Sequence, residues 1–387
     1  MVYNFFSIMP IFVALFWVVT LLIDRNKNNS KRFLAFFLSL SVFNYFAHWL
    51  YFNHQYSFYI VFDGLWIFTS LAGYPLYYYY IRLLTTDTKI NLRWSWLILP
   101  ATLLSVFSIV VYQFMSPQEK EIFIQGILYH HPGYSPPFST LIQLQMLRLA
   151  FFKIIFAIQV VLSVFFGLKL IKAYNLEIKR FYSQTHKKDL RQIKWLLIFF
   201  ILAAFISFTS NTIGKDYFAE NNWLLAIPSA MHSLYLFGIG YVGSRLDFTI
   251  EHFQHDIDEA ETMKSSKIPM IPYNQVKKNL IKLLEEDKIY ANPELRISDV
   301  TFLLNTNRTY VSKVINEEFK TNFSDLINSY RIAYSKEMLS DVSIKSLTLS
   351  QIAENAGFSN NSTFYRIFKE KEGISPGDYR KRHVKFT

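Results

Sequence analysis

Two polar helix faces near the C-terminal end carry the side chains best suited to chemistry in this chain. The first face is expected on a helix over about 307–319 and presents Arg308, Thr309, Ser312 and Lys313. The second is expected on a helix over about 360–371 and presents Asn361, Ser362, Tyr365 and Arg366. Guanidinium, amide and hydroxyl groups form directional hydrogen bonds. Both faces therefore suit the recognition of a base edge.

Each of these helices follows a shorter helix and a tight turn. We expect Ser350 to cap the second short helix, and Gly357 to supply a left-handed turn residue. In the first of the two helix pairs, Ser298 aligns with Ser350 and Asn305 aligns with Gly357. Asparagine tolerates the same left-handed backbone conformation as glycine. A helix over about 323–339 joins the two pairs. A helix-turn-helix places the start of its second helix in the major groove.

The second pair ends in the motifs GFSNNSTFYRIFK (357–369) and GISPGDYR (373–380). With these motifs the chain resembles the AraC/XylS family of bacterial transcription regulators over about 110 residues, from Tyr273 to the end. Thr301 departs from the family, which usually has a small alanine there. A helical domain that binds protein is the alternative for this module.

The resemblance implies double-stranded promoter DNA and RNA polymerase as partners. By position it implies major-groove contacts from Arg308, Thr309, Ser312, Lys313, Asn361, Ser362 and Arg366. It implies phosphate contacts from Lys369, Arg380, Lys381 and Arg382. Arginine reads guanine and asparagine reads adenine, each with about 1–3 kcal/mol of discrimination.

The rest of the chain is much more apolar. Half of the residues (51%) are hydrophobic and 18% are charged, and cysteine is absent, which excludes disulfides and thiolate metal sites. Seven apolar runs approach the length that crosses a bilayer as a helix. They lie near Tyr3–Ile23, Phe33–Phe52, Phe58–Ile81, Trp94–Phe114, Leu147–Ile171, Trp195–Ile213 and Trp223–Val242.

The placement of Lys and Arg orients these spans. Fifteen of them fall in the loops after the first, third and fifth spans, and few fall on the other side. Since the basic side faces the cytoplasm, we expect the N-terminus outside a bacterial inner membrane and the C-terminus in the cytoplasm. The net charge of +11 lies mostly in this part of the chain. A large soluble all-α protein is the alternative interpretation.

Ionisable groups inside spans are candidates for function. Asp63 and Lys153 lie at matching expected depth, so we expect them to pair. With His48 and Trp66 they form a candidate signal pocket that opens to the outer face. A structural ion pair with hydrogen-bonded core histidines is the alternative.

An acidic linker follows the seventh span. Its apolar residues have the four-three spacing of a coiled-coil seam over about two heptads: Leu246, Ile250, Phe253, Ile257 and Ala260. A helix that continues from the seventh span and pairs with its twin in a homodimer is one interpretation, and a lone amphipathic helix is the other.

The sequence thus predicts an all-α chain in three parts: a transmembrane sensor (1–242), a linker (243–272) and a DNA-binding domain (273–387). We expect a membrane-anchored transcription regulator that contacts lipid and an unidentified signal ligand. No enzymatic activity, cofactor or metal is expected. A transporter or membrane enzyme with an appended regulatory domain is the alternative.

Overall fold

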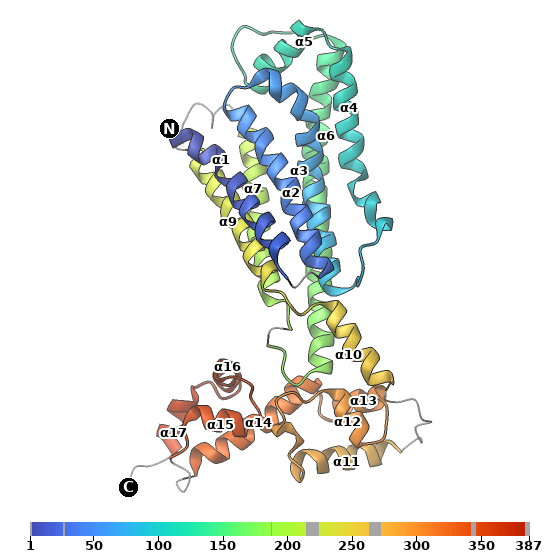
Figure 1. The fold of residues 1–387 in the computed structure, drawn as a ribbon, viewed down its shortest axis with the longest axis vertical. Coiled ribbons are helices and arrows are strands. Elements are labelled where there is room, and N and C mark those ends of the chain that lie inside the picture. The colour runs from blue at the N-terminus through green and yellow to red at the C-terminus, as the bar shows by residue number, and fades with distance from the viewer. Residues whose placement is uncertain are drawn as a thin grey trace. The chain divides into compact units, whose positions relative to one another are not determined.

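The computed structural model describes residues 2–25, 28–186, 188–213, 224–262, 272–341 and 346–383, and within these ranges the chain is mostly helical, without a strand (Figure 1). The predicted all-α fold class is confirmed. The chain divides into two compact units. The first contains Met1–Lys172 and Leu190–Glu251, and the second contains Ala173–Asp189 and His252–Thr387.

All seven predicted spans lie on helices. These are α1 (Val2–Ile23), α2 (Asn29–Phe52), α3 (Tyr56–Thr85), η1 (Leu92–Ile98) with α4 (Leu99–Phe114), α6 (Thr140–Phe181), α7 (Arg191–Ile213) and α9 (Ala226–Ser244). Trp223, the expected start of the last span, lies outside the described residues. Among the described residues, four helical segments are long and apolar enough to cross a membrane: Phe5–Ile23, Asn29–Phe52, Leu92–Phe114 and Thr140–Phe181. The count of seven spans stays a prediction.

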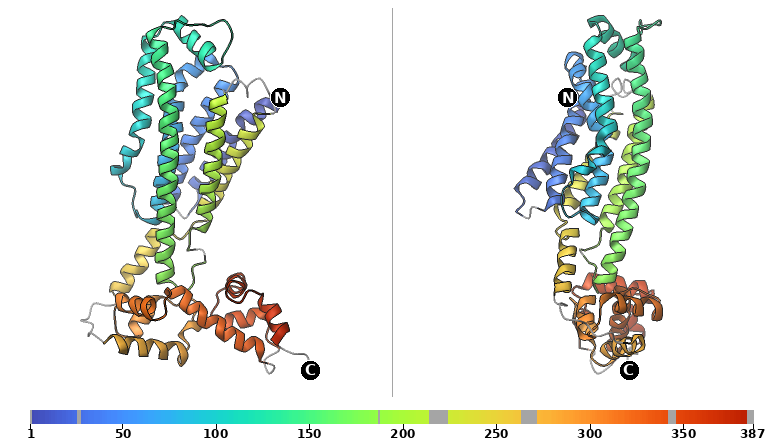
Figure 2. Two further views of the ribbon diagram at one scale, coloured as in Figure 1. Left: turned by 180° about the vertical axis from the view of Figure 1, so that it is seen from behind. Right: turned by 90° about the vertical axis from the view of Figure 1, so that its right-hand side faces the viewer.

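Within the first unit α1 packs between α2 and α9, and α2 and α3 lie side by side (Figure 2). Close approach of α9 to α1 depends on Gly240. A Cβ added there would lie 2.2 Å from the Trp17 ring. Small residues commonly allow such contacts between membrane helices.

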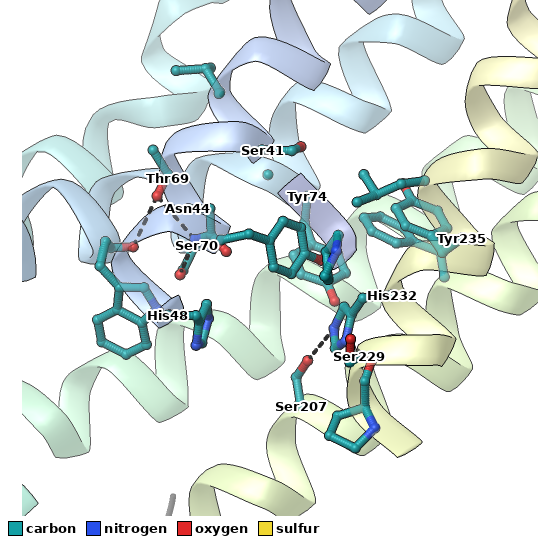
Figure 3. A pocket seen from close by; sticks show the side chains of 18 of the residues that line it. Ser41, Asn44, His48, Thr69, Ser70, Tyr74, Ser207, Ser229, His232 and Tyr235 are labelled. Atoms are coloured by element: carbon teal, nitrogen blue, oxygen red, sulfur yellow. Dashed lines mark hydrogen bonds between the residues drawn. The ribbon is translucent and has the colours of Figure 1, made fainter. Parts of the chain in front are cut away.

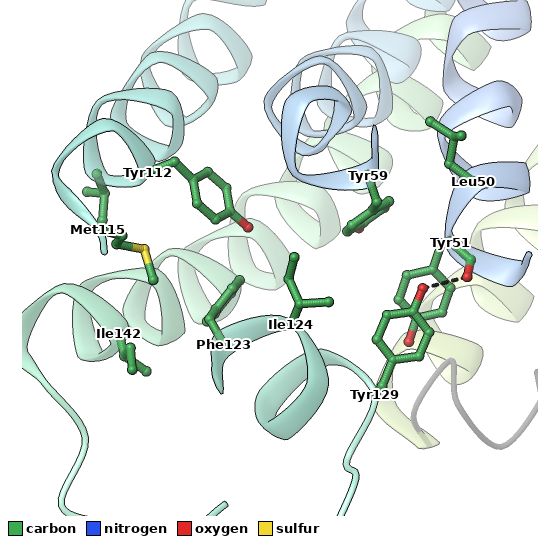
Figure 4. Close-up of a cluster of buried hydrophobic side chains, with 10 residues drawn as sticks. Leu50, Tyr51, Tyr59, Tyr112, Met115, Phe123, Ile124, Tyr129 and Ile142 are labelled. Atoms are coloured by element: carbon green, nitrogen blue, oxygen red, sulfur yellow. Dashed lines mark hydrogen bonds between the residues drawn. The ribbon is translucent and has the colours of Figure 1, made fainter. Parts of the chain in front are cut away.

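The loop after α4 folds into α5 (Pro117–Glu121) and η2 (Ile122–Leu128), which close one end of this unit. At this end of the unit the buried side chains form a hydrophobic cluster that is rich in aromatic rings (Figure 4). The rings of Tyr51 and Tyr129 stack 4.3 Å apart, and the Tyr51 hydroxyl donates to the Leu128 carbonyl at 2.7 Å.

The second unit holds two helix-turn-helix pairs joined by one helix. Its elements are α10 (Ile250–Thr262), α11 (Tyr273–Glu285), η3 (Ile289–Ala291), α12 (Ile297–Leu303), α13 (Arg308–Glu318), α14 (Phe323–Ser340), α15 (Leu349–Asn355), α16 (Asn361–Glu372) and α17 (Pro376–His383). The last turns of α6, from Ala173, also belong to this unit. The predicted connecting helix is therefore confirmed as α14.

The structure bears on one of the two interpretations of the linker. Helix α9 ends at Ser244 and α10 starts at Ile250, so the interpretation of a helix that continues from the seventh span is wrong. Phe253 is only 5% exposed, and its ring lies 5.4 Å from Phe181 at the end of α6. The seam residue that was expected to meet a twin is thus buried within its own chain.

Candidate nucleic-acid interface and membrane pocket

The first helix-turn-helix consists of α12 and α13. Its turn residue Asn305 has φ +46°, the left-handed conformation that the sequence predicted. The side chain of Asn307 caps α13 by accepting from the Tyr310 N–H at 3.0 Å. Thr301 is buried, but its hydroxyl donates to the Ser298 carbonyl at 2.7 Å, so the extra polar group is satisfied within its own helix.

The second helix-turn-helix consists of α15 and α16. Thr348, and not the predicted Ser350, caps α15 in a capping box with Gln351. Gly357 has φ +87°, and a Cβ there would lie 2.4 Å from the Tyr290 carbonyl oxygen. Only glycine fits this turn, because both the backbone conformation and the space exclude a side chain.

The proposed base-reading residues of α16 lie at its exposed start and along its outer face. Asn361, Ser362 and Arg366 are all exposed. The Asn361 amide donates to the Ser350 hydroxyl at 2.9 Å, and Arg366 pairs with Glu370 at 3.2 Å. These contacts are local and exposed, so DNA can replace them at small cost.

The phosphate candidates differ in exposure. Lys369, Lys381 and Arg382 are exposed, whereas Arg380 is partly buried and donates to the Leu347 carbonyl at 2.7 Å. Arg380 thus stabilises the start of the last helix pair. Contact with DNA phosphate stays a prediction for Arg380 and for the other three residues.

On α13, Thr309 and Lys313 are exposed and Ser312 is partly exposed. Arg308 is different. Its guanidinium donates to the Glu177 carboxylate at 3.3 Å and lies 5.2 Å from the centre of the Phe181 ring. A predicted base-reading side chain is therefore engaged by the end of α6.

The segment that follows α6 is built into the same domain. Ser183 is fully buried, and its N–H donates to the Leu295 carbonyl at 3.1 Å. Its carbonyl accepts from the Ser324 hydroxyl at 3.0 Å. Its hydroxyl accepts from Arg331 at 3.2 Å. Ser183 therefore connects the first helix-turn-helix with α14.

Gln184 extends these contacts to the second helix-turn-helix. Its amide donates to the Gly357 carbonyl at 2.8 Å, and its oxygen accepts from Ser359. Beside it an open hollow of about 470 Å³ is lined by Gln184, Lys188 and Ser362, among others. We call residues 177–184 the bracket, because they contact both helix-turn-helix motifs.

Sequence reasoning missed the bracket. Its hydrogen bonds to Arg308, Ser324, Arg331 and Gly357 join residues more than 130 positions apart, and periodicity reports only on neighbours within one element. One signal was present: Glu177 is an acid within a strongly basic loop. A carboxylate in such surroundings indicates a basic partner, and Glu177 has two in the structure, the nearby Arg180 at 2.7 Å and the distant Arg308 at 3.3 Å.

Arg331 connects α14 with the segment Tyr290–Asn292, which precedes the first helix-turn-helix. Its guanidinium is fully buried and donates to the Tyr290 and Asn292 carbonyls, each at 2.7 Å. Burial lowers the pKa of Arg331 from its usual value. Since two backbone carbonyls accept from it, its loss would leave both without a partner.

The linker helix also joins this network. The Tyr182 hydroxyl donates to Asp256 at 2.5 Å, and Arg296 pairs with Asp256 at 3.4 Å and with Glu259 at 3.6 Å. Burial and the bond to Asp256 raise the pKa of Tyr182. His255 lies with Asp256 and Glu259 in a group with metal-ligand spacing, although Arg296 already offsets its acidic charge.

In the first unit the predicted pair of Asp63 with Lys153 is wrong. Asp63 is fully buried and pairs with Arg148 at 2.9 Å, and it accepts from the Tyr59 and Tyr112 hydroxyls at 3.2 and 3.0 Å. Matching depth along two helices does not specify which faces meet, and Arg148 lies on the face of α6 that turns toward α3.

A cavity of about 170 Å³ lies elsewhere in this unit (Figure 3). His48 and Trp66 line it, as predicted, but Asp63 and Lys153 do not. The Trp66 N–H donates to His48 Nε2 at 3.0 Å. His232 joins the same cavity and hydrogen bonds to Ser207 at 2.9 Å. The candidate signal pocket is therefore made of neutral groups.

Comparison with known proteins identifies the C-terminal part. Residues 303–382 match a helix-turn-helix domain family. A Bacillus subtilis protein, the uncharacterized HTH-type transcriptional regulator YtdP, is 29% identical over 110 residues, which cover 28% of this chain and 14% of that protein. The TCP pilus virulence regulatory protein of Vibrio cholerae is 34% identical over 84 residues, covering 22% of this chain and 29% of that protein.

Among solved structures, the C-terminal domain of AraT, a response regulator from Geobacillus stearothermophilus, is 25% identical and aligns over 32% of this chain and 94% of that chain, with a TM-score of 0.25. These relatives are regulators by name, one of them an HTH-type transcriptional regulator. The chain carries a C-terminal helix-turn-helix domain of the AraC type. It spans less than a third of the length of YtdP and of the Vibrio regulator, which are 14% and 29% covered.

Proposed function

We propose that this chain is a membrane-anchored, sequence-specific DNA-binding transcription regulator. Its N-terminus lies outside a bacterial inner membrane and its C-terminal domain lies in the cytoplasm. A signal at the outer face or within the membrane changes promoter binding. The AraC-type domain and the four apolar helices support this proposal.

The bracket is the observation that carries the coupling. It begins on the part of α6 that continues beyond the expected fifth span, and it contacts residues of both helix-turn-helix motifs. The pair with Glu177 and the Phe181 ring hold the Arg308 guanidinium toward the end of α6, and we infer that a bidentate bond to guanine needs a different orientation of this side chain. A signal that shifts α6 therefore changes the availability of Arg308.

The partners of such a regulator are double-stranded DNA, RNA polymerase, lipid and a signal ligand. A homodimer through α10 would have to use the part of the seam beyond Phe253, such as the partly exposed Ile257. Disulfide trapping of an Ile257→Cys variant tests this contact cleanly, since the natural chain has no cysteine.

Chromatin immunoprecipitation of the full chain, combined with membrane fractionation, tests the proposed function. We expect the protein in the membrane fraction and enrichment at discrete promoters. Replacing both Arg308 and Arg366 by alanine should abolish that enrichment. Arg93→Ala, an exposed arginine in the membrane unit, is the matched control. Recovery in the soluble fraction, or site occupancy that survives the double replacement, would contradict the proposal.

A further inference from the structure

The cavity in the first unit is enclosed by helices from most of the bundle. Its lining comes from α1, α2, α3, α6, α7 and α9. Asn44, Tyr45, His48, Ser207 and His232 keep part of their surface accessible although they lie between helices. All five line the cavity, as Figure 3 shows for Asn44, His48, Ser207 and His232.

The lining excludes charged guests. Among the described residues around the cavity there is no Asp, Glu, Lys or Arg. The Trp66 N–H can only donate, so His48 Nε2 accepts, and the ring is a neutral imidazole. His232 bonds the Pro228 carbonyl through Nδ1, which must donate, and Ser207 through Nε2. A buried ion would find no counter-charge there and would be strongly disfavoured.

Size and wall chemistry favour a single ring. The volume of about 170 Å³ is close to that of an engineered cavity of about 150 Å³ that binds benzene. Aromatic side chains make up much of the wall, and Trp66 stacks on Phe152 with their ring centres 4.9 Å apart. Flat rings are the shape that such walls pack best.

Free tyrosine hydroxyls supply the polar recognition. Tyr45 and Tyr74 line the cavity, and neither hydroxyl has a hydrogen-bond partner in the described part of the chain. Tyr74 is only 7% exposed. The Tyr235 hydroxyl is buried and also has no partner among the described residues. Hydroxyl groups without partners in an apolar interior are costly and favour a guest that accepts a hydrogen bond.

Asn44 has no N–H group left for a guest. Thr69 donates its hydroxyl hydrogen to the Leu65 carbonyl at 2.9 Å, so its oxygen must accept from the Asn44 amide at 3.0 Å. Asn44 gives its other N–H to Ser70 at 2.6 Å. Its carbonyl oxygen can only accept, so the hydroxyls of the tyrosines are the donors for a guest.

We propose that this cavity binds a neutral single-ring carbonyl compound, with its carbonyl oxygen on the hydroxyls of Tyr45 and Tyr74. The quinone head group of a membrane-dissolved lipid and a free aromatic ketone share this chemistry. The binding event does not depend on the proposed function. Only its role as the signal rests on that function, so failure of DNA regulation and failure of binding are separate results.

Calorimetric titration of the full chain in nanodiscs tests the proposal, with para-benzoquinone and acetophenone as tailless probes. The chain has no cysteine, so a quinone cannot be trapped as a thiol adduct. Saturable binding is expected for both neutral rings. Benzoate and phenyltrimethylammonium, rings of similar size with opposite charges, should not bind.

Tyr45→Phe and Tyr74→Phe remove one hydroxyl each and keep the ring. Each should weaken binding by about two- to tenfold, the range for one lost hydrogen bond. The unliganded variants should melt at the same temperature as the natural chain or higher, because a hydroxyl without a partner has been removed. Tyr241→Phe, an exposed tyrosine of the same unit, is the matched control.

Unchanged affinity in both phenylalanine variants would overturn the proposal, as would equal binding of benzoate. Absence of saturable binding by every neutral ring would overturn it too. A decyl-tailed benzoquinone, titrated beside empty nanodiscs, separates the two sources. Tighter binding of the tailed ring assigns the site to a lipid quinone, and tighter binding of the tailless ring assigns it to a free compound.

Discussion

Glu177 accepts a hydrogen bond from Arg308 at 3.3 Å, although the two residues lie 131 positions apart in the chain. Both side chains are partly exposed, and such pairs contribute about 0.2–1 kcal/mol. The ring of Phe181 adds a cation–π contact of about 0.5–1 kcal/mol. A contact of this strength orders Arg308 and still opens readily, as a reversible regulatory contact must.

The first prediction concerns this pair. Glu177→Gln removes the charge that holds Arg308 and should raise affinity for operator DNA about two- to fivefold, since the lost pair is worth at most about 1 kcal/mol. Gel-shift titration of the full chain in detergent measures it. Glu286→Gln, which affects an exposed pair with Lys282 on α11, is the control and should leave the affinity unchanged. Lower affinity in Glu177→Gln would show that Glu177 assists DNA binding.

The second prediction compares two glycines with positive φ. Gly357→Ala combines an unfavourable backbone conformation with a clash against the Tyr290 carbonyl, so it should disrupt the turn and abolish DNA binding. Gly373→Ala, at φ +75°, meets no atom within 4 Å and should cost only about 1–2 kcal/mol of backbone strain. Thermal unfolding and gel shift of both variants check this. Equal effects would mean that the space at Gly357 is not limiting.

The third prediction concerns Arg331. Arg331→Met keeps the volume but leaves the Tyr290 and Asn292 carbonyls without a donor, at about 1–3 kcal/mol for each buried group. Faster limited proteolysis within 273–341 should result. Lys320→Met, at an exposed position just after α13, is the control. An unchanged digestion rate would show that water or a neighbouring group replaces the guanidinium.

The fourth prediction separates the two basic residues near Asp63. Arg148→Met leaves a buried carboxylate without a counter-charge and should destabilise the membrane unit by about 3–5 kcal/mol. Lys153→Met should have little effect. Adding Asp63→Asn to Arg148→Met should restore part of the loss. Melting in detergent measures all three, and equal melting of the two single variants would refute the assignment.

Asp63 also tests the alternative of a transporter. Its carboxylate already has three partners, Arg148, Tyr59 and Tyr112. A structural role predicts that Asp63→Asn changes stability and no substrate flux. A flux in vesicles that the natural chain carries and Asp63→Asn loses would favour transport.

The fifth prediction contrasts base reading with phosphate binding. Arg366→Ala should cost about 1–3 kcal/mol on the preferred operator and relax selection at one base pair. Lys381→Ala should weaken binding to all sequences equally and reduce the slope of affinity against salt by about one. Competition gel shifts at several salt concentrations distinguish the two. A uniform loss in Arg366→Ala would place that arginine on the phosphate backbone.

Much of the DNA-binding part could be predicted because its signals are local. The turn residues Asn305 and Gly357 have the positive φ that their types indicated. Helix α16 starts at Asn361, one residue from its expected start, because Asn360 is a strong cap. The short helices start earlier than their serines indicated, α15 with Thr348 as its cap instead of Ser350 and α12 with Arg296 instead of Ser298.

Contacts between distant segments could not be predicted. Hydropathy ended the fifth span at Ile171, but α6 continues to Phe181, since a helix can outlast its apolar stretch. The partner of Asp63 depends on the rotation of α6 about its axis, which depth does not report. For the same reason the bracket, which lies in α6 and the loop after it, was taken for ordinary basic loop sequence.

The burial of Ser183 fixes the bracket within the DNA-binding unit of its own chain. If the chain regulates promoters as proposed, the bracket and operator DNA compete for the orientation of the Arg308 side chain. The effective concentration of an intramolecular competitor is on the order of millimolar, and dilution does not change it. Promoter occupancy at low copy number would then depend on how often Glu177 releases Arg308, and on residues 177–184 as much as on the operator.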